Sequence, residues 1–99
     1  MISLERLDHL VLTVKDIAAT LDFYRRALGM EEIDFGEGRK ALKFGQSKIN
    51  LHQAGHEFEP KVARPTSGSA DLCFITAAPL AEVMEHLRGQ HVPVELGPV

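Results

Sequence analysis

Apolar and polar residues alternate over residues 6–14, which predicts a β-strand with two distinct faces. One face of this strand is apolar and carries Leu10, Leu12 and Val14. The other face carries His9, an imidazole inside a run of otherwise β-forming apolar residues. The histidine is therefore expected to point away from the side chains that join the core.

The spacing of apolar residues then changes to that of a helix over residues 17–28. Asp16 is suited to cap the start of this helix, and Gly29 is suited to end it. The apolar positions recur at helical intervals: Ile17, Leu21, Tyr24 and Leu28. The predicted helix is amphipathic and buries one stripe of its surface.

Three short strands follow, over residues 30–35, 39–45 and 48–53, with sequences MEEIDF, RKALKFG and KINLHQ. Glycine-containing turns separate them, as hairpin connections require. The first half of the chain is therefore predicted to have the element order β-α-β-β-β.

The second half begins with a polar stretch and then repeats the opening pattern. Residues 55–68 contain glycine and proline and are predicted to be a linker. A strand is predicted over residues 70–76, a helix over 79–88 and the start of another strand over 92–96. Shifting the chain by 62 residues places His9 on Asp71 and Val11 on Cys73, which indicates a weak internal repeat.

These patterns predict a single α+β domain over residues 1–99. Its first module spans residues 1–54, residues 55–68 link the halves, and residues 69–99 begin a second, incomplete module. The chain of 99 residues is long enough for one small domain.

Composition excludes several classes of function. The net charge of −3 gives neither a nucleic-acid footprint nor a polybasic membrane patch. No apolar run reaches the roughly 18–20 residues of a membrane-spanning helix, and the charged N-terminal residues do not suit a signal peptide. A single cysteine, Cys73, favours a cytoplasmic location.

The β-α-β-β-β order, the DHLVLTV opening and the FYRRALGM end of the first helix resemble the vicinal oxygen chelate superfamily. Its members include glyoxalase I, bleomycin- and fosfomycin-resistance proteins and extradiol dioxygenases. The stretches RKALKFG and NLHQAGHEFEPK are most similar to proteins of the glyoxalase domain-containing protein 5 type. The resemblance covers nearly the whole chain, but the family's DPDGN-type segment is absent, so the chain resembles a truncated member.

The resemblance implies a fold and a metal site. Paired β-α-β-β-β modules curve into an open cup built of a mixed, mostly antiparallel sheet, with a divalent metal at its floor. His9 matches the first-strand ligand, Asp71 takes the equivalent place in the second module, and His52 lies near the last-strand ligand position, which itself falls on Asn50. Imidazole and carboxylate donors suit zinc, iron, nickel or manganese. The fourth ligand and the general base are expected outside this chain, so no catalytic residue is assigned.

Four further residues are expected to contact a small-molecule ligand in the cup: Val11, Thr13, Asn50 and Cys73. Taken without the resemblance, each candidate also has a structural interpretation. His9 and His52 can be hydrogen-bonded structural histidines, and Asp71 can bond a loop amide. Cys73 can be a small buried apolar residue.

Two functions from different classes therefore stay open. The first is a metal-dependent lyase or isomerase acting on a small molecule with adjacent oxygens. The second is a metal-free binding protein of the bleomycin-resistance type. In either case an incomplete second module leaves a sheet edge unpaired, which predicts a homodimer.

Overall fold

The computed structural model describes residues 1–95 and shows a mixed α+β fold, as predicted. The elements along the chain are β1 (His9–Val14), α1 (Ile17–Leu28), β2 (Glu31–Phe35), β3 (Arg39–Phe44), β4 (Ser47–Gln53) and α2 (Leu80–Gly89). The β-α-β-β-β order of the first half is confirmed, and α1 has the bounds that its apolar spacing predicts.

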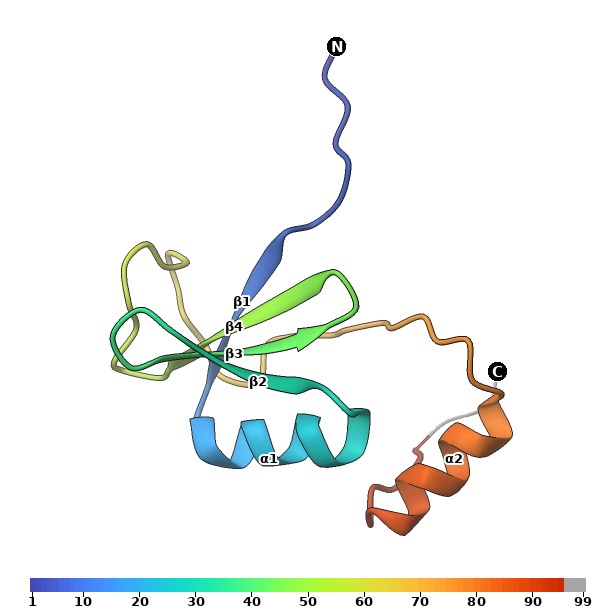
Figure 1. Cartoon of the computed structure of the whole chain (residues 1–99). Helices are drawn as coiled ribbons and strands as arrows, with labels where there is room; N and C mark the ends of the chain where they lie inside the picture. Colours follow the sequence, from blue (N-terminus) through green and yellow to red (C-terminus); the bar gives the residue numbers. More distant parts are fainter. Residues whose placement is uncertain (96–99) are drawn as a thin grey trace.

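The four strands form one open sheet in the order β1-β4-β3-β2 (Figure 1). The hairpins β2–β3 and β3–β4 are antiparallel, whereas β1 pairs with β4 in parallel. Gly36, Gly38 and Gly45 lie in the hairpin turns with φ angles of 56°, 71° and 53°. This left-handed backbone is readily available only to glycine, so these residues permit the tight connections.

Helix α1 covers one face of the sheet (Figure 1). The Asp16 side chain accepts a hydrogen bond from the Ala19 amide at 3.0 Å, and Gly29 ends the helix with a φ angle of 67°. The core lies between this helix and the sheet, and its buried members are Val14, Leu21, Met30, Leu42, Ile49 and Leu51. Burial of these side chains is the main source of the stability of the fold.

Residues 70–76 are described outside any strand, which corrects the prediction made for them. The stretch lies against the first half through Leu72, which packs on the core, and Phe74, whose ring centroid lies 5.3 Å from that of Phe44. Ile75 is 96% exposed. A strand needs a hydrogen-bonding neighbour, and this stretch has none among the described residues. Residues 92–95 are likewise not a strand, and residue 96 of that prediction lies outside the described residues.

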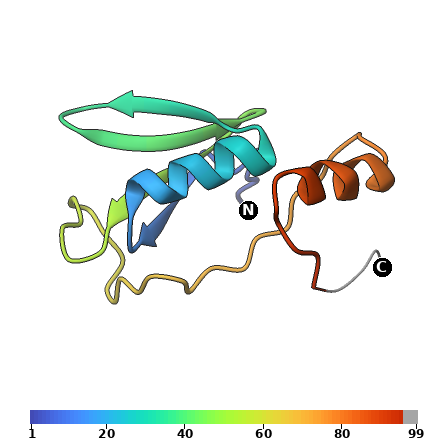
Figure 2. The same ribbon diagram turned by 90° about the horizontal axis from the view of Figure 1, so that it is seen from below.

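Helix α2 forms within one residue of its predicted bounds but does not cover a sheet. None of its residues is buried, and both views show it standing beside the sheet at the end of an extended segment (Figures 1 and 2). The Arg26 guanidinium on α1 donates a hydrogen bond to the carbonyl of Gln90, just after α2. Within residues 1–95, α2 therefore does not pack on a face of the sheet as α1 does. Neither described helix is long and apolar enough to span a bilayer.

Candidate functional site

The strand registers place twelve side chains on the sheet face opposite α1, which we call the open face. They are His9, Val11, Thr13, Glu31, Ile33, Phe35, Arg39, Ala41, Lys43, Lys48, Asn50 and His52. Most of the residues predicted to form the site therefore share one surface. That surface mixes polar with apolar side chains, whereas the α1 face of the same strands carries the buried apolar core, with the charged Glu32, Asp34 and Lys40 beside it.

His9 begins β1 and is oriented by its neighbour. Its Nδ1 lies 2.8 Å from a carboxylate oxygen of Asp8, and its side chain is 41% exposed. This hydrogen bond is the main cause that lowers the pKa of Asp8 below its ordinary value. A carboxylate on one imidazole nitrogen holds the proton there and leaves the other nitrogen free to bind a metal. His9 therefore has the local arrangement of a metal-ligating histidine.

His52 lies on β4 with only 6% of its surface exposed. Its Nδ1 is buried without a hydrogen-bond partner, and the Phe58 ring lies 6.1 Å away between centroids. Burial lowers the pKa of His52 below 6.5, and the nearby Arg39 guanidinium lowers it further. The imidazole is therefore neutral at neutral pH, with a buried polar atom that the rest of the described chain leaves unpaired.

The two histidines share a face but not a position along it. In the parallel ladder His9 lies opposite Lys48, whereas His52 lies opposite Thr13. Four residues separate the two positions, which is about 13 Å along a strand. Two nitrogens bound to one ion would lie about 3–4 Å apart, so one chain does not bring both imidazoles to a single metal. Within residues 1–95 no group of three His, Cys, Asp or Glu side chains could hold an ion.

Asn50 lies between these positions, two residues from His52 on the same strand. Its Oδ1 is buried without a hydrogen-bond partner. It pairs with Val11 in the ladder, which makes it a diagonal neighbour of His9. Thr13, opposite His52, is 6% exposed. Val11, Thr13 and Asn50 thus all lie on the open face, as their predicted role in ligand binding requires.

Asp71 and Cys73 lie on the extended segment after the linker, and both are exposed. Their chain neighbours Leu72 and Phe74 make the contacts with the first half. Neither residue belongs to the open face of the sheet. Within the described part of one chain, Asp71 and Cys73 therefore add no ligand to the surface that carries His9.

The sequence analysis did not single out Arg39, although the structure gives it a central place. Its guanidinium carbon lies 4.5 Å from the centroid of the Phe58 ring and 5.9 Å from that of Phe35. Lys48 Nζ lies 4.6 Å from the centroid of Phe35. The sequence did contain a signal for Arg39. Side chains alternate along β3 and Leu42 faces the core, so Ala41 and Arg39 point to the opposite face.

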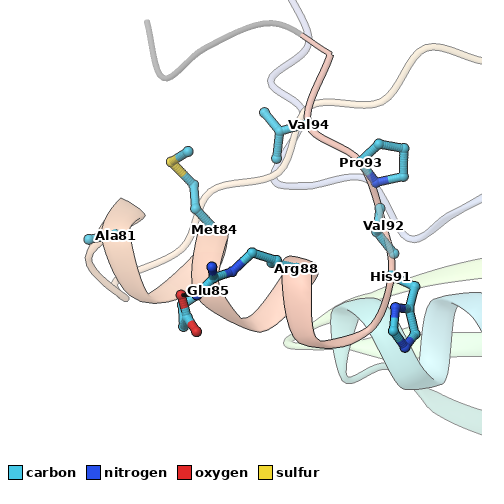
Figure 3. Close-up of a pocket in the computed structure, with 8 residues that line it drawn as sticks. All are labelled: Ala81, Met84, Glu85, Arg88, His91, Val92, Pro93 and Val94. Carbon is cyan, nitrogen blue, oxygen red and sulfur yellow. Dashed lines mark hydrogen bonds and ion pairs between the residues drawn. The ribbon is translucent and has the colours of Figure 1, made fainter.

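A separate hollow lies between α2 and the chain that follows it (Figure 3). Eight residues line it: Ala81, Met84, Glu85, Arg88, His91, Val92, Pro93 and Val94. The Arg88 guanidinium in its wall pairs with Glu85 one turn earlier on α2. None of the predicted site residues lies here, and its lining is mainly aliphatic. We therefore place the candidate site on the open face and not in this hollow.

Comparison with known proteins agrees with this fold. The virulence protein STM3117 of Salmonella typhimurium is 52% identical over 96 residues, which are 97% of this chain and 67% of that protein. The glyoxalase domain-containing protein RDO1 of Mycosarcoma maydis is 52% identical over 98 residues, which are 99% of this chain and 55% of that protein. The chain thus spans roughly half to two thirds of these relatives.

A solved structure supports the same assignment. An integron cassette protein from the mobile metagenome of Vibrio cholerae superposes with a TM-score of 0.96 at 54% identity, over 100% of this chain and 77% of that one. The model of the glyoxalase/bleomycin resistance protein/dioxygenase superfamily matches residues 6–98. Because this match covers almost the whole sequence, the chain belongs to the glyoxalase/bleomycin resistance protein/dioxygenase superfamily.

Proposed function

We propose that the open face binds a small molecule with adjacent oxygens and promotes a lyase- or isomerase-type reaction on it with a divalent metal. The observation that supports this proposal is the Asp8–His9 pair, which leaves one imidazole nitrogen of an exposed histidine free. Zinc, iron, nickel and manganese all accept such a donor. When bound, the metal would act as a Lewis acid toward the two substrate oxygens.

The residues of this chain would then hold and orient the ligand. Asn50 Oδ1 is an acceptor without a donor, so it suits a hydroxyl group of the ligand. His52 is neutral, and the Phe58 ring beside it limits the access of water. Thr13 and Val11 lie across the ladder from these two residues and give the surface its shape.

His9 fits a metal ligand, but the described part of one chain does not supply the remaining donors. A second copy of the chain can supply Asp71, which is exposed on a segment without a sheet partner. Strand β1 is one of the two edges of the described sheet and has one side unpaired. Exposed edges of this kind pair with other chains, so we propose a homodimer in which the β1 edge of one copy meets the Asp71 segment of the other.

Metal analysis of the purified protein tests the proposal. Wild-type protein is expected to retain or take up one of the four metals in equilibrium dialysis, and His9→Ala is expected to lose it. His56→Ala serves as a matched control because His56 is exposed and lies off the sheet. Equal metal content in wild type and His9→Ala would contradict the assignment of His9. Sedimentation at tens of micromolar tests the dimer, and a pure monomer would count against it.

The metal-free binding protein is the second candidate, and one observation favours it. Because His9 and His52 are offset by four residues along the ladder, a single chain cannot bring both imidazoles to one metal ion. If wild-type protein takes up no metal but binds small molecules through the open face, this second function is the correct one.

A further inference from the structure

Cations are unevenly distributed between the two faces of the sheet. On the α1 face, Lys40 pairs with the carboxylates of Asp34 and Glu32. On the open face, Arg39, Lys43 and Lys48 have no carboxylate within ion-pair distance among residues 1–95; the ion pairs of that range involve other residues. The chain as a whole carries a net charge of −3, so the unpaired positive charges of this surface are opposite in sign to the net charge of the chain.

Two of these cations lie on aromatic rings instead. Arg39 lies over Phe58 at 4.5 Å, and Lys48 Nζ lies over Phe35 at 4.6 Å. A ring attracts a cation through its quadrupole but does not neutralise its charge. Arg39 also donates one hydrogen bond to the Glu59 carbonyl at 3.3 Å, which leaves most of its N–H groups free. Arg39 also lies 5.9 Å from the centroid of Phe35, its ladder partner, so both cations meet at the same ring. The long Lys48 side chain thus brings its charge toward the Arg39 end of the strands, although its backbone lies four residues from His52 on β4.

His52 adds a neutral donor next to Arg39. The last ladder pair between β3 and β4 joins Lys40 to Leu51, so Arg39 and His52 come next at the same end of the two strands. Both contact Phe58. Of the two ring nitrogens of His52, only Nδ1 is buried and unpaired, so Nε2 is the nitrogen that can donate to a ligand.

The acidic groups near these side chains are engaged elsewhere. The Asp8 carboxylate lies close enough to Lys48 to interact with its charge, but it is paired with His9 and Arg6. The Glu57 carboxylate accepts a hydrogen bond from the Gly55 amide at 2.8 Å, and that bond is the main cause that lowers its pKa. Glu59 meets Arg39 through its backbone carbonyl, and its side chain is not within ion-pair distance. A guanidinium fork without a carboxylate matches the geometry of a planar or tetrahedral oxyanion.

We propose that Arg39, Lys48 and His52 Nε2 form an oxyanion-binding site on the open face, so that the ligand of this protein is a small acid. Arg39 binds the anion through its fork, Lys48 approaches it as a point charge, and His52 donates the remaining hydrogen bond. Asn50 Oδ1 accepts from a hydroxyl next to the acid group. The inference rests on the proposed function only in placing the ligand on this face, since it requires no metal.

An NMR titration of the ¹⁵N-labelled full chain tests the site. The protein is first passed over a chelating resin, so that a failure of the metal proposal leaves this measurement unaffected. The probes are lactate, propane-1,2-diol and inorganic phosphate at constant ionic strength, because salt screens such contacts. Lactate and the diol share a hydroxyl on adjacent carbon and differ in the acid group.

Lactate is expected to shift the amides of Arg39, Lys48 and His52 and to saturate in the millimolar range, with the diol at least tenfold weaker. Phosphate that saturates at the same amides assigns the site to oxyanions in general, whereas a response to lactate alone assigns it to carboxylic acids. Arg39→Gln is expected to weaken the binding of lactate at least tenfold, and Lys48→Gln is expected to weaken it at least threefold. Lys40→Gln removes one charge from the neighbouring residue on the other face and should change affinity less than twofold.

Three results would overturn the proposal. The first is that neither lactate nor phosphate saturates the shifts, and the second is that lactate and the diol bind equally. The third is that Lys40→Gln weakens lactate binding as much as Arg39→Gln does. Thermal melting of each variant separates lost binding from lost folding. Lys48→Gln keeps the test decisive if Arg39→Gln does not fold, because Lys48 reaches over the sheet surface and lies outside the core.

Discussion

Replacing His52 by leucine should make the protein more stable, because the wild-type imidazole buries a polar atom without a partner. His52 is 6% exposed, and its Nδ1 has no hydrogen-bond partner. An unsatisfied buried polar group costs about 1–3 kcal/mol. Only one of the two ring nitrogens is orphaned, so we take the low end of this range. The free energy of unfolding of His52→Leu should then rise by about 1 kcal/mol, or about 4–8 °C in Tm for a domain of this size.

The same substitution should remove a pH dependence. The folded pKa of His52 lies below 6.5, so the unfolded chain binds the proton more readily than the folded one. This residue therefore contributes stability that is present above pH 6.5 and is lost as pH falls through the lowered pKa. Urea unfolding of wild type at pH 7.5 and pH 5.5 should show this loss, and His52→Leu should reduce it.

Urea and thermal unfolding at one protein concentration measure both effects, since association also shifts apparent stability. His56→Leu is the matched control, because His56 is exposed and should change stability by less than about 0.5 kcal/mol. A loss of 1 kcal/mol or more in His52→Leu would refute the reasoning. It would mean that Nδ1 has a favourable partner in solution, such as a bound water.

Three further predictions concern the elements that hold the open face in place, and urea unfolding measures each of them. Asp16→Ala removes the cap hydrogen bond to Ala19 and should cost about 1 kcal/mol, whereas Asp16→Asn should retain most of the stability. Gly29→Ala places a side chain at a φ angle of 67° and should cost about 1 kcal/mol, and an unchanged midpoint would show that this helix end adopts another conformation. Ile49→Val removes one methylene from a side chain that is 1% exposed and should cost about 0.5–1.5 kcal/mol; no loss would mean that the core closes around the gap.

The first half of the fold was predictable because its signals are local. The α1 boundaries follow from Asp16 and Gly29, and both residues act through contacts within their own turn. The second half carries equally good local patterns, yet residues 70–76 do not form a strand. Alternation shows that a stretch can pair, but the partner must come from elsewhere in the fold or from another chain. No pattern within the stretch itself contains that information.

The candidate site was likewise predictable only in part from local patterns in the sequence. Alternation along each strand predicted that His9, Val11 and Thr13 share a face and that Asn50 and His52 share one, and the family resemblance placed both sets in one cup; the strand register puts them on one surface. Alternation did not predict how far apart two residues lie along that face, because this distance depends on the register between strands. Register is set by the whole sheet and by the packing of α1. Arg39 was missed for a related reason, since its importance depends on Phe58, which comes from a loop.

Packing on one face of β4 fixes what the other face presents. Ile49 and Leu51 are each 1% exposed in the core, and between and after them Asn50 and His52 carry the two orphaned polar atoms. A slip of one residue would exchange these pairs, which would move the amide and the imidazole under α1 and move two large apolar side chains from the core to the open face. The burial of a side chain of this size contributes about 1.5–3 kcal/mol, so the core strongly disfavours the slip. The packing of the apolar side chains therefore fixes the direction in which the polar side chains of the strand point. Polar side chains that lower stability can persist on the open face, because burial on the opposite face stabilises the strand in this register.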